Sequence, residues 1–430
     1  MEANFSLLAM TLPEFFEKSV GLVWNIPLIA LLAGSGILLS LLALGGRGII
    51  QFKGFGHAID VVRGKYDDPG DPGEISHFQA LCTALSATVG LGNIGGVAVA
   101  MHMGGPGAVF WMIVVGFFGM ALKYSECTLA VKFRYVDDKG VVHGGPMHYI
   151  ERGLGKAWKP LAIIFALGIM ISSFGAGNMY QTNQVAEILH ANFEISKTVT
   201  GVVLAVATAL VIIGGIKRIG SVTSKLVPVM GVIYFLGCIV VIGMNIDKVP
   251  GLIGQIFTGV FQGTAATGGF AGAAVAIVVR EGFKRACFSN EAGMGSAAVA
   301  HSAATTKEPV REGVVALLEP FIDTVVICTM TALVILISGA WTTDANGVNL
   351  TAMAFDSSIK GFGRWFVPVA VTLFAYSTLL SWSYYGERGA DYLFGEAGVL
   401  PFKIVFCIFA IVGAVNELGP VLNFSDTVFG

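Results

Sequence analysis

The sequence has little charge. Asp, Glu, Lys and Arg make up 13% of its 430 residues, about half the ~25% of an ordinary soluble domain, which excludes that class of protein. The net charge of −2 gives no sign of a nucleic-acid partner. The six cysteines show no CxxC motif and no paired spacing, so we expect neither a disulfide framework nor a cysteine metal site. The N-terminus lacks a basic segment followed by a small-residue cleavage site, so we expect no cleaved signal peptide.

Apolar residues are abundant instead. They make up 55% of the chain, the mean hydropathy is +0.76, and runs long enough to cross a bilayer recur from end to end. We therefore predict an all-α polytopic membrane protein with ten spans. The expected spans are residues 22–44, 80–103, 108–132, 160–190, 198–216, 223–245, 252–283, 312–338, 364–386 and 401–418.

Basic residues in the loops alternate between the two sides of the membrane. One side holds 20 of the 26 Lys and Arg residues and the other holds 5. The positive-inside rule places the first side in the cytoplasm, which predicts a plasma-membrane protein with its N-terminus outside. Residues 287–306 are also apolar, but a crossing there would put Lys307 and Arg311 outside. We therefore expect a cytoplasmic re-entrant or amphipathic segment.

Two glycine-rich breaks interrupt predicted spans, at residues 86–96 and 263–272. Each interior glycine costs a helix ~1 kcal/mol relative to alanine, and in lipid an unwound backbone persists only where protein buries it or it lines a cavity. Interrupted spans in matching halves of a chain indicate the substrate and ion site of a transporter.

The two broken spans cross the membrane in opposite directions, which predicts an inverted repeat. We expect an extra N-terminal helix and a basic cytoplasmic loop in residues 1–79, a first five-helix repeat in 80–250, and a second, inverted repeat of four spans in 251–430. A complete second repeat needs one more span after Pro420, so we expect the chain to be truncated.

The first break permits several interpretations. Residues 90–95 match the dinucleotide pattern GxGxxG, but an apolar helix precedes them where that motif requires a strand. Close helix packing through glycine is one alternative, and backbone exposed to a ligand is the other. Unwound carbonyls can replace a cation's hydration shell, and the N–H groups of the resuming helix can bind a carboxylate. Asn93 adds an uncharged side-chain oxygen.

Five motifs in order resemble the alanine/glycine:cation symporter family, and the first is also similar to the unwound helix of the bacterial leucine transporter. They are residues 86–96, 144–151, 214–220, 264–272 and 288–293. The resemblance covers about residues 74–430. It implies a leucine-transporter-type (LeuT-like) inverted repeat with one extra N-terminal helix and without the family's final helix.

The resemblance implies a sodium site at the first break. Its ligands would be the backbone carbonyls of Ser86 and Val89 and the hydroxyls of Ser377 and Thr378, with Asn93 nearby. Neutral oxygens suit a hard monovalent cation. The alternative for both hydroxyls is a hydrogen bond within their own helix.

The resemblance also implies a place for an amino-acid substrate. Its carboxylate would lie in a cradle made by Thr88, Gly90, Leu91 and Gly92, and the second break would face it with Thr267 and Phe270.

The fourth predicted span carries amide side chains. Phe174, Asn178 and Gln181 recur at helical spacing, so we expect them to share a face. Polar side chains in a span usually face the interior. Gln181 is our candidate for binding the substrate's ammonium group, whereas Asn178 either lies beside it or bonds another helix. Bulky walls formed by Trp382, Phe174 and Phe270 would leave room for little more than a methyl group, which favours alanine or glycine.

Ionisable residues also lie within predicted spans. Asp323 is near mid-membrane, and Lys123 and Glu126 form an i,i+3 pair. Such residues indicate function by default, here a proton or second-cation site. The alternative is mutual neutralisation, of Lys123 with Glu126 or with Asp323. The histidines show no zinc-like spacing and no evident carboxylate partner, so we expect no metal other than sodium.

These features together predict a sodium-coupled symporter of alanine or glycine in the lipid bilayer, without enzymatic activity or an obligate protein partner. Proton coupling is the alternative. An ion channel would need a continuous polar path, whereas the polar groups cluster at mid-membrane. An intramembrane enzyme would need a nucleophile or a metal set, and neither a GxSxG elbow nor an HExxH motif is present.

Overall fold

The computed structural model describes residues 19, 24, 26–46, 48–261 and 271–429, and the structural statements below concern these residues. They form a bundle of helices with one antiparallel hairpin, β1 (Tyr135–Val136) and β2 (Val142–His143). Before the hairpin lie α2 (Ile26–Leu42), α3 (Ile50–Lys53), α4 (Phe55–Val62), α5 (His77–Thr88), η2 (Gly92–Gly96), α6 (Val97–Gly104) and α7 (Gly107–Phe133).

The remaining elements follow the hairpin. The first group is α8 (Pro146–Tyr149), η3 (Ile150–Leu154), η4 (Lys156–Trp158), α9 (Lys159–Phe174), η5 (Gly175–Met179), α10 (Tyr180–Phe193), α11 (Lys197–Ile212), α12 (Gly215–Met244) and α13 (Val249–Gly259). The second is α14 (Ala271–Asn290), α15 (Ser296–His301), α16 (Pro309–Ala316), α17 (Leu318–Pro320), η6 (Phe321–Cys328), α18 (Thr329–Ser338), η7 (Ala340–Thr342), α19 (Gly347–Ser358), α20 (Phe362–Phe394), α21 (Glu396–Val415) and α22 (Leu418–Phe429).

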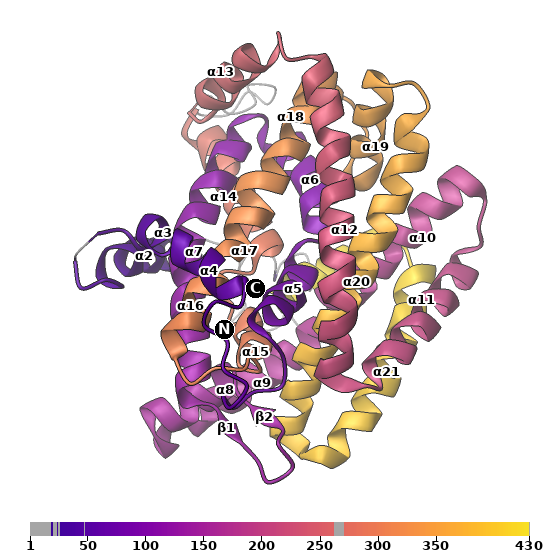
Figure 1. The fold of residues 1–430 in the computed structure, drawn as a ribbon. Coiled ribbons are helices and arrows are strands. Elements are labelled where there is room, and N and C mark those ends of the chain that lie inside the picture. The colour runs from indigo at the N-terminus through magenta and orange to yellow at the C-terminus, as the bar shows by residue number, and fades with distance from the viewer. Residues whose placement is uncertain (1–18, 20–23, 25, 47, 262–270, 430) are drawn as a thin grey trace, which may run out of the picture.

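Most of the expected spans are present as helices. Within the described residues, six continuous helical stretches are long and apolar enough to cross a membrane, and a seventh span results if the bent pair His77–Thr88 and Gly92–Gly104 is one crossing. Figure 1 shows α12 and α20 running along the height of the bundle. The expected span 198–216 is a shorter helix, Lys197–Ile212. In the expected span 252–283, residues 262–270 lie outside the described residues.

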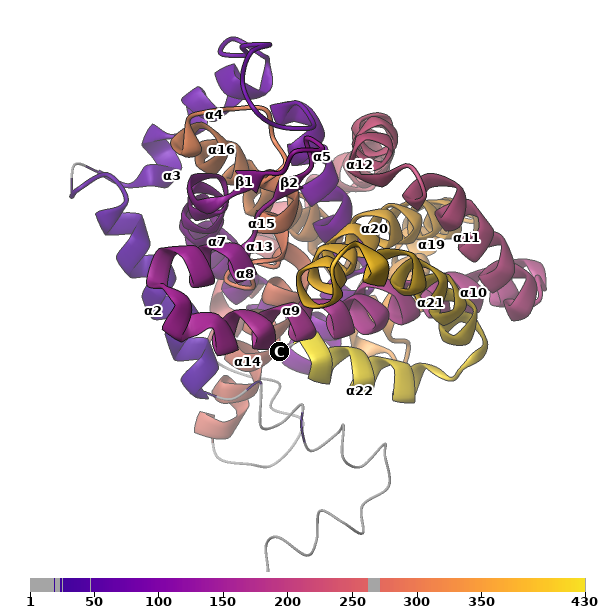
Figure 2. The ribbon, with the colours of Figure 1, turned by 90° about the horizontal axis from the view of Figure 1, so that it is seen from below.

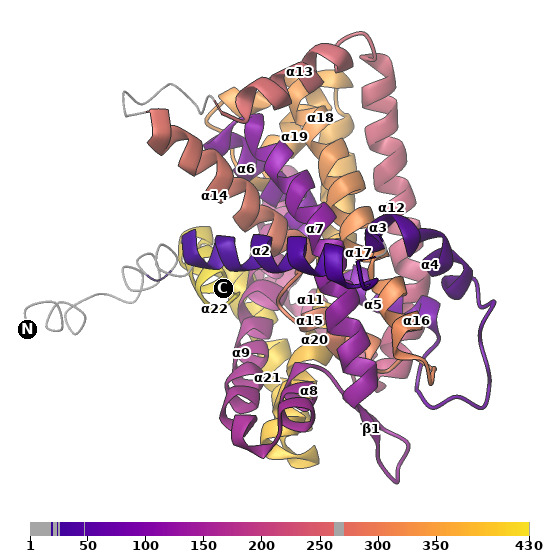
Figure 3. The same ribbon diagram turned by 90° about the vertical axis from the view of Figure 1, so that its left-hand side faces the viewer.

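The expected first span differs from a simple crossing. Its described helix, α2, has 17 residues, or about 25 Å of length, which is less than the ~30 Å of bilayer hydrocarbon. Figure 3 shows α2 lying across α7, at an angle to the long helices. The side chain of Gln51 fastens the chain after α2 to the bundle, because it donates to Ser40 Oγ (2.6 Å) and to the Phe117 carbonyl (3.1 Å).

Local sequence explains where the broken span begins. Ser76 caps α5 by accepting a hydrogen bond from the Gln79 N–H (3.2 Å), and the Gln79 side chain accepts one from the Ser76 N–H (3.0 Å). This reciprocal capping box satisfies two N–H groups that would otherwise lack partners at a helix start. The first turn of α5 is thereby fixed, and the helix then runs into the glycine-rich break.

Small residues let the helices approach closely. A Cβ atom built on Gly313 of α16 would overlap the side chain of Thr128 on α7, and one built on Gly282 of α14 would lie 2.7 Å from the Ala108 carbonyl oxygen of α7. Packing of this kind, with interhelical hydrogen bonds, drives helix association in lipid, where the hydrophobic effect between helices is absent. Figure 2 shows α22 running beside α9 and α10 at the edge of the bundle.

Candidate functional site

The first glycine-rich break interrupts a helix, as expected. Helix α5 ends at Val89, whose ψ of 83° is not helical, and the chain resumes through the π-helical turn η2 into α6 with a bend of 48°. Asn93 stabilises the unwound part, because its Oδ1 accepts a hydrogen bond from the Gly90 N–H (2.8 Å). The element before the break is a helix, so the dinucleotide-binding interpretation is excluded.

Oxygen atoms gather where α5 meets α20. The hydroxyls of Ser377 and Thr378 lie 3.2 and 3.1 Å from the Ser86 carbonyl oxygen. They also lie 2.8 and 3.0 Å from the Phe374 carbonyl of their own helix, so the hydrogen bond within the helix is present, whereas the role as sodium ligands stays a prediction. All four residues are buried. The cluster has no formal charge and only oxygen ligands, which is the donor set a hard monovalent cation requires.

Gln181 lies beside the same break. A Cβ atom built on Gly90 would lie 2.5 Å from Thr378 Oγ1 and 3.7 Å from Gln181 Oε1. The Gln181 amide nitrogen donates to the Ala176 carbonyl (3.0 Å), whereas its buried Oε1 has no hydrogen-bond partner among the described residues. A buried acceptor without a partner costs about 1–3 kcal/mol. Gln181 Oε1 is therefore available to a donor such as an ammonium group.

Phe174 and Asn178 both face α21, whereas Gln181 lies at the break, so the expected common face is wrong for Gln181. A π-helical turn, η5, separates α9 from α10, and its wider turn shifts the register that a regular α-helix would keep. Gln181 consequently leaves the face of Phe174 and Asn178. The Asn178 amide donates to the Phe406 carbonyl of α21 (2.6 Å). The ring of Phe174 also contacts α21, with the Phe402 ring at 5.3 Å between centroids. The interhelical hydrogen bond is thus the correct alternative for Asn178.

Trp382 belongs to a different group of rings. It packs against Gly177 so closely that a Cβ atom there would overlap the indole. Its Nε1 donates to Glu291 Oε1 (3.0 Å), and its ring contacts Tyr385 and Phe429, with centroids 5.5 and 5.9 Å away. The structure does not bring Phe174 to Trp382 as one wall.

The remaining candidates for the carboxylate cradle are buried at the break. The Thr88 hydroxyl donates within α5, to the Ala84 carbonyl at 3.3 Å. Leu91 is fully buried, and Gly92 lies against α14, since a Cβ atom there would be 2.9 Å from Ser289 Cα. Thr267 and Phe270 lie outside the described residues.

Asp323 is held by neutral groups. Its Oδ1 accepts from the Asn93 amide (2.6 Å) and from the Ser289 hydroxyl (3.0 Å), and its Oδ2 accepts from Thr324 Oγ1 (2.6 Å). The direct ion-pair partner of Lys123 is Glu319, at 3.1 Å, and the described residues show no direct ion pair of Lys123 with Asp323 or Glu126. Asp323 therefore joins the first break to η6 as a fully buried carboxyl group without a cationic partner among these three donors.

The end of α14 and the residue after it contribute side chains to which the sequence analysis assigned no role. Ser289 bonds Asp323, Asn290 donates to Thr324 Oγ1 (3.0 Å), and Glu291 holds Trp382. Almost all of residues 287–306 are buried, so the amphipathic surface segment is wrong and the re-entrant alternative fits. The signal in the sequence was the run of three polar residues inside an apolar stretch, within a motif already used for the family resemblance.

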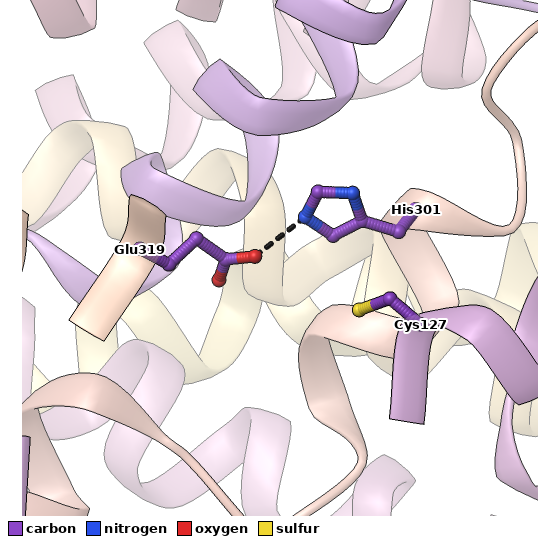
Figure 4. Close-up of side chains that lie close together, drawn as sticks. All are labelled: Cys127, His301 and Glu319. Carbon is purple, nitrogen blue, oxygen red and sulfur yellow. Dashed lines mark hydrogen bonds and ion pairs between the residues drawn. The ribbon is translucent and has the colours of Figure 1, made fainter. Parts of the chain in front are cut away.

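The histidines do have carboxylate partners, contrary to expectation. His77 and His301 both bond Glu312, and His301 also bonds Glu319. His143 of β2 lies 3.3 Å from Asp391 of α20. Figure 4 shows His301 and Glu319 close to Cys127. These partners are distant in the sequence, so spacing alone could not reveal them.

Comparison with known proteins agrees with this geometry. A family model described as the sodium:alanine symporter family matches residues 9–430. The sodium/alanine symporter AgcS of Methanococcus maripaludis is 45% identical over 414 residues, which cover 95% of this chain and 89% of AgcS. The amino-acid carrier protein AlsT of Bacillus subtilis is 37% identical over 384 residues, covering 89% of this chain and 80% of AlsT.

A solved structure shows the same fold. The crystal structure of MhsT in complex with L-phenylalanine superimposes with a TM-score of 0.60 and covers 84% of this chain and 87% of MhsT. At 15% identity this similarity concerns the fold alone. The expected leucine-transporter-type architecture is therefore confirmed, and so is the expectation that the family comprises transporters and not enzymes.

Proposed function

Because the chain belongs to the sodium:alanine symporter family, we propose that it carries small neutral amino acids, alanine or glycine, across the plasma membrane together with sodium. The observation that carries this proposal is the contact across the first break, where the Ser377 and Thr378 hydroxyls meet the Ser86 carbonyl beside the unpaired Gln181 Oε1. The oxygens that would bind an ion and an acceptor that would bind an amino group are thus neighbours, which supports the proposal.

Sodium would bind between α5 and α20. Its ligands would be the carbonyl oxygens of Ser86 and Val89 and the hydroxyl oxygens of Ser377 and Thr378, whose lone pairs can turn toward the ion. Since these groups come from two helices, the ion would fasten the inner half of the broken span to α20. Motion of α5 about the break would then depend on whether the site is occupied, which is a means of alternating access.

The substrate would lie beside the ion. Its carboxylate would meet the N–H groups of Leu91 and Gly92 at the start of the resuming helix, since the Gly90 N–H already donates to Asn93 Oδ1. Its ammonium group would donate to Gln181 Oε1. Trp382 would limit the size of the side chain, with Thr267 and Phe270 on the facing segment. Phe174 and Asn178 bond α21, so we assign them to support of this site and not to contact with substrate.

A second cation site would centre on Asp323. Its carboxyl group accepts three hydrogen bonds from neutral donors and lies next to Asn93, which bonds the break itself. A negative charge in that position would attract a second sodium ion or a proton. Each positive charge moved inward gains about 2.3 kcal/mol per 100 mV of membrane potential.

The test is uptake of labelled alanine into proteoliposomes. We expect accumulation under an inward sodium gradient and its loss when potassium or choline replaces sodium, with excess glycine competing. Equal uptake driven by a proton gradient alone would contradict sodium coupling and would instead support a proton at Asp323.

A further inference from the structure

Five ionisable side chains form a buried network on the α5 side of the break. His77 at the start of α5 bonds one oxygen of Glu312, and His301 Nδ1 lies 2.5 Å from the other. His301 Nε2 lies 2.5 Å from Glu319 Oε1, and the Lys123 ammonium lies 3.1 Å from Glu319 Oε2. None of these side chains is more than 1% exposed. Bases and carboxylates alternate without interruption from α5 to α7.

The two contacts of the His301 ring determine how many protons this group of side chains holds. A neutral imidazole has one N–H and one lone pair, so it can donate to only one carboxylate. His301 faces a carboxylate oxygen with each nitrogen. Either both nitrogens carry hydrogen or one glutamate is protonated, and in both cases the trio of His301, Glu312 and Glu319 holds one proton more than a neutral histidine between two carboxylates.

A metal ion does not fit this arrangement. Cys127, His301 and Glu319 offer ligand atoms within 4.8 Å of one another, and Figure 4 shows the three side chains. However, both nitrogens of His301 already face carboxylates, and the Lys123 ammonium forms an ion pair with the second oxygen of Glu319. A divalent ion would have to displace the proton and stand beside a buried cation.

Other ionisable groups surround this network and interact with it electrostatically. They are Asp67 before α5, Glu126, Cys127 and Arg134 on and after α7, Tyr149 of α8, Glu291 after α14, Asp323 of η6 and Tyr385 of α20. Among them only Arg134 is a permanent cation, and its guanidinium bonds backbone carbonyls of residues 304 and 306. The surroundings therefore favour retention of a positive charge at His301.

We propose that this network of five side chains is a proton-binding site. A proton held at His301 between Glu312 and Glu319 fastens α5 to α16. Through His77, Glu312 joins the cytoplasmic half of the broken span to α15 and α16. Loss of the proton leaves two carboxylates facing each other across a neutral ring, which weakens this contact. When α5 moves away, water reaches His301 and the proton leaves toward the side on which α5 begins. The presence of the bound proton does not depend on the proposed function. The effect of the proton on the motion of α5 rests on the proposed function.

The bound proton can be observed without transport. The full chain in lipid nanodiscs, with 15N- and 13C-labelled histidine, is examined by solid-state NMR at pH 8, where a histidine with the ordinary pKa of 6.5 is about 3% protonated. We expect an imidazolium signal with both ring nitrogens protonated that is absent from His301→Gln and retained in His190→Gln on the exposed end of α10. His143→Gln identifies any imidazolium signal that comes from His143, which is paired with Asp391 and Asp137. A single-protonated His301 with both glutamates ionised, or a metal-bound imidazole that a chelator releases, would overturn the proposal.

If the proton resides on a glutamate and not on His301, infrared difference spectra detect the protonated carboxyl group. A protonated carboxyl band at pH 8 that Glu319→Gln or Glu312→Gln removes would still place the extra proton in this trio. Absence of both this band and the imidazolium signal would refute the site, even if His301→Gln failed to fold.

The effect on motion is tested by uptake at different lumenal pH, with right-side-out protein. In the wild type, uptake should accelerate as lumenal pH rises through the range where the site loses its proton. This response should be lost in His301→Gln and His77→Gln and kept in His190→Gln. An unchanged pH response in both network variants would overturn the coupling to α5, and absence of sodium-driven uptake in the wild type would instead count against the proposed function.

Discussion

At the residue scale, Thr378 connects the break to α20 through one hydroxyl group. Thr378→Val removes that oxygen but keeps the shape of the side chain. We expect the sodium concentration for half-maximal uptake to rise about tenfold or more, since losing a hydrogen-bonding group beside a charge costs about 1.5–3 kcal/mol. Thr378→Ser should restore it. Thr372→Val is the matched control, because that hydroxyl bonds only the Pro368 carbonyl of its own helix (2.7 Å); an equal effect in both variants would contradict a sodium ligand at Thr378.

Gln181 allows binding to be separated from stability. Gln181→Leu removes a buried acceptor that has no partner among the described residues, but it also removes the hydrogen bond to the Ala176 carbonyl. These opposite effects are each about 1 kcal/mol, so the thermal stability of the substrate-free protein should change little. Alanine affinity should fall about tenfold or more, measured by isothermal titration calorimetry. Gln184→Leu changes an amide one turn later that bonds Asn183 and should leave alanine affinity nearly unchanged. Unaltered affinity in Gln181→Leu would contradict its role with the ammonium group.

Gly177 permits the closest approach of Trp382. Gly177→Ala should displace the indole and lower the free energy of unfolding by about 1–3 kcal/mol, as overpacking does. Gly168→Ala in α9 is the control, since a Cβ there meets no atom within 4 Å and alanine favours the helix. Thermal unfolding in detergent distinguishes the two; equal melting temperatures would show that Trp382 is not fixed by Gly177.

At the scale of elements, the hairpin β1–β2 is attached to α20 by a titratable contact. His143 lies 3.3 Å from Asp391 and 3.1 Å from Asp137, and its pKa is raised above 6.5, chiefly by the hydrogen bond to Asp391. Because the folded-state pKa is raised, the stabilisation is fully present below pH 6.5 and is lost as pH rises through the raised pKa.

Hydrogen exchange of residues 136–142, corrected for the intrinsic effect of pH, measures this contact. Protection should decrease between about pH 6 and pH 9 in the wild type. His143→Gln should remove the pH dependence, whereas His190→Gln should keep it. Protection that rises with pH would contradict the ion pair.

Elements could be predicted from the sequence wherever a local property, such as a long apolar run or a cluster of glycines, defines them. Long apolar runs gave most of the spans, and glycine clustering gave the break between α5 and α6, because both are local properties. The direction of Gln181, after η5, could not be predicted, since a π-helical turn leaves no mark in apolar periodicity. It shifts Gln181 off the face on which Asn178 bonds α21. The pairing of Lys123 with Glu319 was also missed, because ion pairs between helices depend on tertiary packing.

At the scale of the whole molecule, the candidate site depends on segments far apart in the chain. Ser86 meets Ser377 across 291 positions, and Asn93 meets Asp323 across 230. The family resemblance predicted the first of these pairs and the sequence pattern named Asp323 as functional, but neither predicted that Asp323 would bond the break. The inverted relation of residues 80–250 and 251–430 remains our proposal.

Sodium and substrate should act on each other through the first break. If sodium raises alanine affinity by some factor, alanine must raise sodium affinity by the same factor, and couplings of this kind are commonly about 1–3 kcal/mol, or 5- to 150-fold. Thr378→Val should reduce both factors together, because the ion and the cradle share residues 86–92.

The most direct measurement is calorimetric titration of the purified wild type with alanine, in sodium and in choline at equal ionic strength. The account predicts alanine binding at least about fivefold tighter in sodium, and loss of most of that difference in Thr378→Val. Equal alanine affinity in the two salts would contradict the claim that the first break couples an ion to an amino acid.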